Sequence, residues 1–390
     1  MRLRLPLVAP HAREHTYCAY CPKLCRHTCP VSTVEASETT SPWGKMSSLH
    51  RVDTGALPMH ESYAASWYAC TGCLACRESC AHGNEVAAAL GAGRSEAVAQ
   101  GVAPATALKV ISEHGRRGEK FEAAAASLFG EARTSASSTV YFPGCSGVAT
   151  GDPSALDEWK AVSALAETPP RVEVSECCGL PLLEAGDQAG FIAAAARFVE
   201  RTRNAKGVVF GDAGCMHALT KIAPSLGVKA PAKSEHVTEL FARHLARMAP
   251  SLNDEGGPVR YHDPCRLGRG LGIYDAPRAV LGKVLGRAPD EFHHHREQSL
   301  CSGAGGQLPR TRPESAAAIA AMTLDEHGSL GGGLVVTGCV SAKRRFERAG
   351  ARTTTLASLV VRSLERLAAP TEIASPETVP SASPDGGRNW

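Results

Sequence analysis

Cysteine is the residue type in this sequence whose number and spacing could do chemistry. The 390-residue chain has fifteen cysteines, and eight of them lie within its first 100 residues. Such a density is unusual in a reducing compartment unless the thiols have a use other than disulfides, and an odd number fits disulfide pairing badly. Metal binding is therefore the leading interpretation of these residues.

Two short runs near the N-terminus have the spacing of ferredoxin motifs. Residues 17–30 read YCAYCPKLCRHTCP and residues 69–81 read ACTGCLACRESCA. The second run has the CxxCxxCxxxC spacing of a bacterial ferredoxin without its final proline, whereas the first has the proline but one extra residue between its second and third cysteines. In two-cluster ferredoxins the fourth cysteine of each run reaches the other cluster. The spacing therefore predicts one 4Fe–4S cluster on Cys18, Cys21, Cys25 and Cys80, and another on Cys70, Cys73, Cys76 and Cys29. Structural zinc is the alternative, because paired CxxC sequences also suit zinc, although zinc would not need the last two cysteines of each run.

The other seven cysteines form an internal repeat. The first copy contains Cys145, Cys177, Cys178 and Cys215, and the second contains Cys265, Cys301, Ser302 and Cys339. In both copies 36 residues separate the central pair from the last cysteine. The flanking residues also match, since YFPGC corresponds to YHDPC, CCGLP to CSGAGG, and DAGC to VTGC. We interpret the two segments as copies of one module.

The adjacent pair Cys177 and Cys178 is the unusual feature of this repeat. Neighbouring cysteines form a disulfide with each other only under strain, because the bond needs a Cα separation of about 4.4–6.8 Å and a definite torsion. Buried packing is one alternative for the seven cysteines, but packing alone does not explain the repeated spacing. Zinc is the stronger alternative, because four thiolates suit its tetrahedral coordination. Adjacent thiolates are better suited to reaching two different iron atoms.

The pattern of apolar residues predicts an α+β fold. Short apolar runs read as buried strands at residues 139–142, 172–175, 207–210, 259–262 and 334–337. Helical patterns lie at residues 85–100, 105–114, 155–167, 191–202, 237–248 and 315–327. Strands that alternate with helices predict parallel sheets, whose ligands gather at the carboxyl ends of the strands. Each lone cysteine of the repeat follows a predicted strand.

The combination resembles a known family. A two-cluster ferredoxin domain followed by a duplicated CCG module is similar to the iron–sulfur subunits of glycolate oxidase and anaerobic glycerol-3-phosphate dehydrogenase, and to the catalytic D-type subunit of heterodisulfide reductase. The resemblance covers residues from about 15 to 345 and rests on CAYCPKLCRHTCP, CTGCLACRESC, FPGC, CCGLP, YHDPC and CSGAGG. It implies a further 4Fe–4S cluster on Cys145, Cys177, Cys178 and Cys215, with the neighbouring thiolates on different irons. It also implies a helical two-cluster ferredoxin domain at 1–115 and CCG modules at 139–250 and 258–365. The tail at 366–390 has almost no apolar content, so we expect it to be disordered.

The sequence departs from the disulfide-cleaving members of that family. Their motif closes with CxxC, but Ala218 and Ala342 occupy the last position here, so the fifth thiolate is absent twice. His217 could replace it, because imidazole can replace thiolate at iron, although a loop or hydrogen-bonding role is favoured. Ser302 leaves the second module with three cysteines, so that it could hold a cluster with an open iron, a different metal or nothing. The run of His293, His294 and His295 lies outside the repeat and reads as a solvated loop.

Electron transfer is the function that these features predict. No GxGxxG fingerprint lies in a βαβ context, so the electrons must come from another protein. We expect an iron–sulfur oxidoreductase subunit that takes electrons from a flavoprotein dehydrogenase or an electron-transfer flavoprotein and delivers them toward the quinone pool, with quinone or a membrane subunit as a further partner. One alternative is a catalytic disulfide reductase acting at the CCG cluster, which the missing cysteines disfavour. The other is a regulatory iron–sulfur sensor, for which no DNA-binding helix or basic stripe is seen.

Composition sets limits on partners and location. The net charge is +3 and 21% of the residues are charged, which gives no reason to expect a nucleic-acid partner. No apolar run approaches the roughly 18 residues that a membrane span needs, and MRLRLPLVAP is too short and too rich in proline for a secretory signal. We therefore expect a soluble, cytoplasmic protein, with peripheral attachment to the inner membrane as an option.

Overall fold

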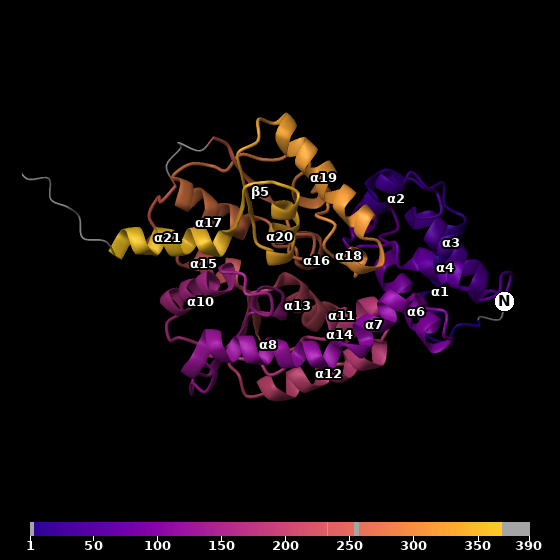
Figure 1. Ribbon diagram of the computed structural model, residues 1–390, viewed down its shortest axis with the longest axis horizontal. Helices are drawn as coiled ribbons and strands as arrows, with labels where there is room; N and C mark the ends of the chain where they lie inside the picture. Colours follow the sequence, from indigo (N-terminus) through magenta and orange to yellow (C-terminus); the bar gives the residue numbers. More distant parts are fainter. Residues whose placement is uncertain (1–3, 232, 253–256, 369–390) are drawn as a thin grey trace, which may run out of the picture.

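The structure is a computed structural model that describes residues 4–231, 233–252 and 257–368. The predicted α+β class is confirmed, because helices surround two small parallel sheets (Figure 1). The helical N-terminal part lies at one end of the molecule, and both sheets lie in the remainder. Most of the predicted disordered tail lies outside the described residues, and the last described helix extends to Ala368.

The N-terminal part consists of short helices joined by cysteine-bearing loops. Its elements are η1 (Ala9–His11), α1 (Ala12–Ala19), η2 (Arg26–Thr28), α2 (Pro30–Glu35), α3 (Pro42–Asp53), α4 (Glu61–Trp67), α5 (Ala75–Glu78) and α6 (Val86–Ala99). The fully buried Met46, Leu49 and Trp67 belong to a core in which α3, α4 and α6 pack together. The predicted helices at 85–100 and 105–114 are confirmed as α6 and α7 (Ala105–Ser112). The long α8 (His114–Phe129) and η3 (Gly130–Arg133) lead to the first module.

The first module holds a four-stranded parallel sheet of order β2-β1-β3-β4. Its elements are β1 (Thr139–Phe142), α9 (Cys145–Val148), α10 (Ser154–Leu165), β2 (Arg171–Val172), α11 (Leu180–Ala185), α12 (Gln188–Thr202), β3 (Gly207–Phe210), α13 (Ala213–His217), η4 (Ala218–Ile222), α14 (Ala223–Ser225), β4 (Ser234–His236), α15 (Val237–Arg243) and η5 (Leu245–Arg247). The strand predicted at 172–175 ends sooner, because the Glu173 carboxylate accepts the backbone N–H of Ser175 at 3.0 Å and turns the chain. The helix predicted at 237–248 is divided between α15 and η5.

The second module repeats this topology in a three-stranded parallel sheet of order β5-β6-β7. Its elements are β5 (Val259–His262), α16 (Gly268–Leu271), α17 (Asp275–Leu285), η7 (Arg296–Gln298), α18 (Leu308–Thr311), α19 (Pro313–Ser329), β6 (Leu334–Thr337), α20 (Val340–Arg348), β7 (Thr353–Thr355) and α21 (Leu356–Ala368). A single bridge between Arg260 and Asp290 stands where β2 pairs with β1 in the first module. The matching order of pairing supports the interpretation of a duplication.

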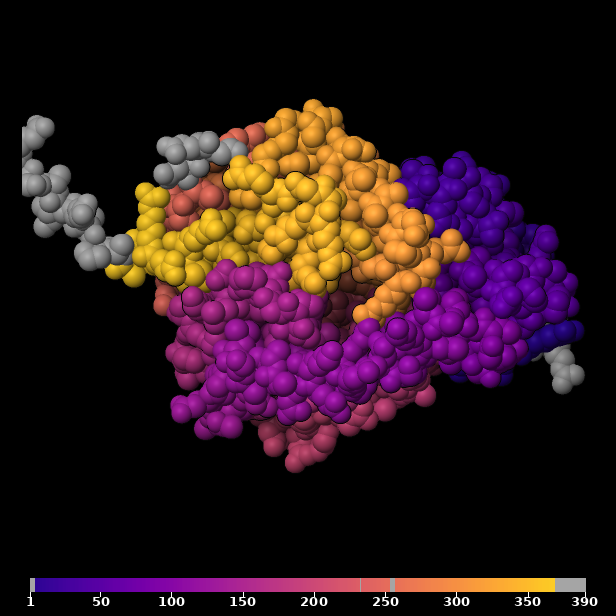
Figure 2. Space-filling model, viewed as in Figure 1, coloured from indigo at the N-terminus to yellow at the C-terminus, as the bar shows by residue number. Residues whose placement is uncertain are grey.

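The two modules share one hydrophobic core. Helices α10 and α15 of the first module pack against α21 and α17 of the second, around fully buried side chains such as Val162, Phe241, Val280 and Leu359. Figure 2 shows the two modules packed against each other, with the N-terminal part at one end. The carboxyl ends of both sheets therefore keep a fixed position relative to each other.

Candidate metal centres

All fifteen cysteines are free thiols in the structure. Within the described ranges, no three His, Cys, Asp or Glu side chains converge as they would around a single metal ion. A 4Fe–4S cluster separates its four thiolates more widely than a single ion does, because each thiolate binds its own iron atom. A looser grouping of four thiols is therefore the arrangement that such a cluster requires.

The four cysteines predicted for the first cluster lie within electrostatic range of one another. Burial, followed by the thiols of Cys18, Cys80 and Cys21, raises the pKa of Cys25 to about 11. Burial also raises the pKa of Cys18 to about 11, and a hydrogen bond that Asn84 Nδ2 donates to Cys18 Sγ at 3.4 Å opposes this rise. Cys80 is the fourth cysteine of the other sequence run. The structure therefore places it with the three cysteines of the first run, as the ferredoxin spacing predicts.

The four cysteines predicted for the second cluster line one cavity. The walls of this cavity include Cys29, Cys70, Cys73 and Cys76. Gly72 and Leu74 both have a φ of +65°, so the loop turns tightly between its cysteines. The backbone N–H of Gly72 donates to Cys70 Sγ at 3.4 Å. Both N-terminal groups therefore contain three cysteines of one run and the fourth of the other, and their assignment as ligands is our proposal.

Lys45 of α3 also lines the cavity of the second cluster. Its place in this site was not predicted from the sequence. Its side chain is 1% exposed, and its Nζ donates to the backbone oxygen of Ala69 at 2.7 Å and lies 3.8 Å from Cys29 Sγ. Burial alone would lower the pKa of Lys45, but the surrounding thiols, led by that of Cys29, raise it above its ordinary value. Its helical position gives a signal that could have located it, since Lys45 shares a face of α3 with the buried Leu49.

The four cysteines of the first CCG module form one continuous group. Cys145 begins α9 after β1, Cys177 and Cys178 precede α11, and Cys215 lies in α13 after β3. The Sγ atoms of Cys145 and Cys177 are 3.7 Å apart. The thiols of Cys177 and Cys215 both act on the pKa of Cys178, and all four cysteines pack in one hydrophobic cluster. The structure therefore brings together the set that the repeat predicted, at the carboxyl ends of the strands.

Glycines allow these segments to approach one another. Gly144 has a φ of +74°, and a Cβ added there would lie 2.6 Å from the Cβ of Asp212 and 3.3 Å from Cys215 Sγ. Gly179 has a φ of +81°, and a Cβ there would lie 2.9 Å from the Cβ of Ala194. Asp212 also caps α13, because its carboxylate accepts the backbone N–H of Cys215 at 2.9 Å. The glycines of FPGC and CCGLP are therefore required because a larger residue at either position would collide with the neighbouring segment.

The first-module thiols suit an iron–sulfur cluster chemically. The hydrogen bond with Cys177, and then burial, raises the pKa of Cys145, and burial contributes to a raised pKa at Cys177, Cys178 and Cys215 as well. Four neighbouring thiolates would repel one another, so the bare group keeps its protons. Metal binding requires deprotonated thiolates, and the positive charge of iron removes that repulsion. The donor set therefore fits a cluster whose binding releases protons.

The cysteines of the second module lie near the N-terminal part. Cys301 and Cys73 lie in one buried cluster, where the Cys301 thiol lowers the pKa of Cys73 and the Cys73 thiol raises that of Cys301. The thiol of Cys265 acts on the pKa of both Cys301 and Cys339, so the three remain within electrostatic range. Burial raises the pKa of Cys339 to about 12. The half-buried Ser302 stands next to Cys301, at the position of the second adjacent cysteine in the first module.

Two arginines near these thiols were missed by the sequence reasoning. Arg269 is 5% exposed, and its Nε donates to the backbone oxygen of Cys73 at 2.7 Å. Burial alone would lower the pKa of Arg269, but the thiols of Cys73, Cys265 and Cys301 raise it. Arg266 Nη1 donates to His217 Nδ1 at 3.1 Å. The second module therefore places two positive charges near Cys265, whereas Asp212 lies near Cys145 and Cys215 of the first module and Cys339 of the second.

The histidines singled out in the sequence have other partners in the structure. Burial, and then the charge of Arg266, lowers the pKa of His217 to about 3, so this residue is a neutral hydrogen-bond acceptor. Its ring also packs on Gly270, where an added Cβ would lie 2.8 Å from the imidazole. His294 is exposed and pairs with Glu326, and His295 bonds the backbone oxygen of Phe292 at 2.9 Å. The arrangement supports the hydrogen-bonding and solvated-loop interpretations.

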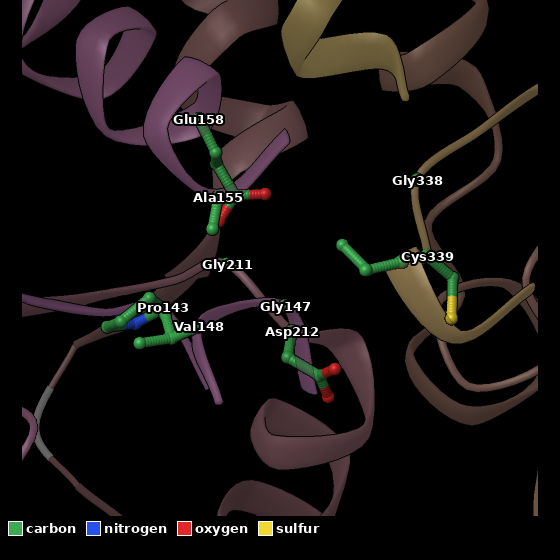
Figure 3. A pocket seen from close by; sticks show the side chains of 10 residues that line it. Pro143, Gly147, Val148, Ala155, Glu158, Gly211, Asp212, Gly338 and Cys339 are labelled. Carbon is green, nitrogen blue, oxygen red and sulfur yellow. The ribbon is translucent and has the colours of Figure 1, made fainter. Parts of the chain in front are cut away.

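A separate cavity lies between the two CCG modules. Pro143, Glu158 and Asp212 line it from the first module, and Gly338 and Cys339 face them from the second (Figure 3). The hydroxyl of Tyr141 donates a hydrogen bond to Glu158 Oε1 at 2.6 Å. Burial raises the pKa of Glu158 to about 7. The interface therefore contains a half-buried acid whose pKa lies near neutral pH.

The sequence matches two kinds of iron–sulfur domain. Residues 14–84 match the 4Fe–4S dicluster domain, and residues 139–220 and 259–343 each match the cysteine-rich domain named CCG. The chain is therefore an iron–sulfur protein in which a dicluster domain precedes two CCG domains. No helix among the described segments is long and apolar enough to cross a membrane.

Its relatives include components of heterodisulfide reductases. The D-type subunit of the dihydromethanophenazine:CoB–CoM heterodisulfide reductase of Methanosarcina barkeri is 30% identical over 179 residues, which are 44% of this chain and 43% of that protein. An Hdr-like menaquinol oxidoreductase iron–sulfur subunit of Archaeoglobus profundus is 38% identical over 75 residues, 19% of this chain and 13% of that protein. An EtfAB:quinone oxidoreductase of Syntrophomonas wolfei is 42% identical over 73 residues, 18% of this chain and 10% of that protein. The aligned segments span less than half the length of each of these relatives.

Proposed function

We propose that this chain is an iron–sulfur electron-transfer subunit that takes electrons from a flavoprotein dehydrogenase or an electron-transfer flavoprotein and passes them toward the quinone pool. The observation that carries the proposal is the grouping of twelve cysteines into three sets of four, two in the N-terminal domain and one in the first CCG module. Clusters bound there, two 4Fe–4S clusters in the N-terminal domain and one in the first module, would supply one-electron steps. The protein holds the thiols in place, and six of these twelve cysteines are buried.

The names of relatives support this choice of partners. One relative is called an EtfAB:quinone oxidoreductase and another a menaquinol oxidoreductase subunit. We infer from these names that a flavoprotein is the electron donor and a quinone the acceptor. Peripheral attachment to a membrane on the cytoplasmic side follows as part of the same proposal, since quinones reside in the membrane.

The surface beside Cys18 and Cys25 offers a docking face for the flavoprotein. Tyr20 is 80% exposed and Leu24 is 70% exposed, and exposed apolar patches mark interaction sites. Arg13 stacks on the ring of Tyr17 in the same segment, which gives the face a positive charge. Helix α1 lies at the end of the molecule away from the CCG modules (Figure 1). We therefore infer that an acidic face of the flavoprotein docks here.

Anaerobic purification tests the cofactor content first. Three 4Fe–4S clusters correspond to about twelve irons per chain, and four or fewer irons with stoichiometric zinc would contradict the proposal. The purified protein is then mixed with reduced electron-transfer flavoprotein and a quinone analogue. Electron transfer to the quinone is expected, and Cys177→Ser or Cys178→Ser should abolish it while the EPR signals of the N-terminal domain remain.

A paired variant tests the docking face separately. Tyr20→Ser combined with Leu24→Ser should slow reduction by the flavoprotein at least tenfold, while reduction by dithionite stays normal. Leu156→Ser on α10 is the matched control, because Leu156 is also exposed but lies in the first CCG module. Equal effects of both changes would contradict the assignment of this face.

Catalytic disulfide reduction is the second candidate, favoured by the cavity between the modules. Reducing a disulfide to two thiols consumes two electrons and two protons, and the half-buried Glu158 could donate a proton there. The absent fifth thiolates count against this candidate, because Ala218 and Ala342 cannot bind metal. Rapid reduction of a disulfide by the purified protein, together with indifference to quinones, would make it the better account.

A further inference from the structure

Lys45 is a buried ammonium whose polar neighbours belong to the second thiol site. Its Nζ lies 2.7 Å from the backbone oxygen of Ala69 and 3.8 Å from Cys29 Sγ, and the residue is 1% exposed. The groups that act on it most strongly are the thiols of Cys29, Cys70 and Cys76. Among the described residues, the guanidinium of Arg94 also acts on it, and this group has the same sign of charge.

Burying an ammonium in this way is costly unless negative charge lies close by. The carbonyl of Ala69 supplies a dipole but no net charge. The negative charge must then come from the cavity itself, either from the thiolates or from the group that they hold. Water is excluded from Lys45, so its field on that group is weakly screened.

The first thiol site has a different electrostatic environment. Its hydrogen-bond donor to Cys18 is the neutral amide of Asn84. The carboxylate of Glu14 adds negative charge near the same thiol. Lys23 lies in the loop of this run, but it is 38% exposed and pairs with Glu38 at 3.6 Å. Solvent and pairing therefore weaken the positive charge at the first site.

We propose that Lys45 is a positioning residue that holds the second cluster by charge and makes it the more easily reduced of the two N-terminal clusters. The inference rests on the proposed function, because it requires that both thiol groups hold clusters. An added electron makes a cluster more negative, so a fixed positive charge beside it favours the reduced form. An electron that enters near Cys18, beside the exposed Tyr20 and Leu24, is thereby drawn inward to the Lys45 side, where Cys73 and Cys301 of the second CCG module share a buried cluster. One electron moves, with no bond made or broken.

The test is an EPR-monitored redox titration of the full-length protein. Lys45→Met keeps the length of the side chain and removes the charge, so the equilibrium constant for reducing the second cluster should fall at least tenfold, which is 59 mV for one electron. Lys45→Arg keeps the charge and should restore most of that loss. Lys23→Met is the control, because it removes an exposed lysine at the first site and should leave the potential of the second cluster unchanged.

A measurement on the wild-type protein covers the case in which Lys45→Met fails to fold. The first EPR signal to appear on reduction should disappear in Cys29→Ser and remain in Cys18→Ser. A first signal that depends on Cys18 would overturn the inference and leave the proposed function intact, as would an unchanged potential in Lys45→Met. Wild-type protein without the iron of two clusters would overturn both.

Discussion

Cys301 of the second CCG module and Cys73 of the N-terminal domain belong to one buried cluster, in which each thiol acts on the pKa of the other. Both residues are buried, at 5% and 7% exposure. The glycine-rich segment after Cys301 packs on the loop that carries Cys73, so closely that a Cβ at Gly306 would overlap the backbone oxygen of Cys70. The second CCG module therefore packs directly on the second thiol site. It has a structural role there even though its own set of cysteines is incomplete.

Replacing Cys301 should change the second N-terminal cluster without removing it. Hydrogen bonds to cluster sulfurs raise reduction potentials, and one such bond contributes about 0.5–1.5 kcal/mol, or roughly 20–65 mV for one electron. Cys301→Ala should therefore lower the potential of the cluster on Cys73 by about this amount, as measured by EPR-monitored titration. Cys339→Ala removes a thiol of the same module that faces the other cavity and should leave this potential alone. A shift of equal size in both variants would mean that the contact with Cys73 has no special effect.

Crossing of the fourth cysteines gives a second prediction. Cys29 belongs to the first sequence run but lies in the cavity of Cys70, Cys73 and Cys76. Cys29→Ala should therefore remove or convert the second cluster and spare the one on Cys18. Cys25→Ala, in the same run, should do the opposite. EPR spectra of both variants decide the matter, and loss of the Cys18 signal alone in Cys29→Ala would show that the runs do not cross.

The spacing of residues was sufficient to predict how most of the cysteines group. Cys80 belongs with Cys18 because the ferredoxin spacing implies a crossing, and Cys145 belongs with Cys177 because the internal repeat places both after strands. The apolar runs at 139–142 and 207–210 were also sufficient, because buried strands of parallel sheets are continuously apolar. These predictions depend on local patterns, and local patterns are visible in a single sequence.

Other features depend on contacts between distant segments. Strands β4 and β7 read SEH and TTT, so no apolar run indicates them. Lys45 and Arg269 have side chains that are usually exposed. Arg269 is buried where the second module docks on the backbone of Cys73, and Lys45 is buried where the cysteine loops fold over α3. The contact between Cys73 and Cys301 likewise follows from domain packing, which has no periodicity in the sequence.

Two of the glycines with positive φ in the first module, Gly144 and Gly151, allow a matched steric test. Gly144→Ala should prevent assembly of the cluster on Cys145 and Cys215, because the new Cβ would meet Asp212 at 2.6 Å and the φ is +74°. Gly151 is the control, since its φ is +66° but nothing lies within 4 Å of an added Cβ. Gly151→Ala should cost only about 1–2 kcal/mol of unfolding free energy, from backbone strain. Iron content and EPR would distinguish the two, and full cluster occupancy in Gly144→Ala would contradict the close packing.

Glu158 should make the stability of the protein depend on pH near neutrality. Burial raises its pKa from 4.5 to about 7, against a hydrogen bond from Tyr141 that lowers it, and Asp212 adds to the rise. A carboxyl group whose pKa is higher in the folded state binds its proton more tightly there, so its contribution is fully present below pH 4.5 and is lost as the pH rises through 7. The shift corresponds to about 3 kcal/mol. Glu158→Gln should therefore be more stable than the wild type at pH 8 and similar at pH 5, as measured by denaturant unfolding under anaerobic conditions. Asp157→Asn is the control, because it changes the neighbouring carboxylate on the same helix. Parallel pH profiles of the wild type and Glu158→Gln would show that Glu158 does not titrate in this range.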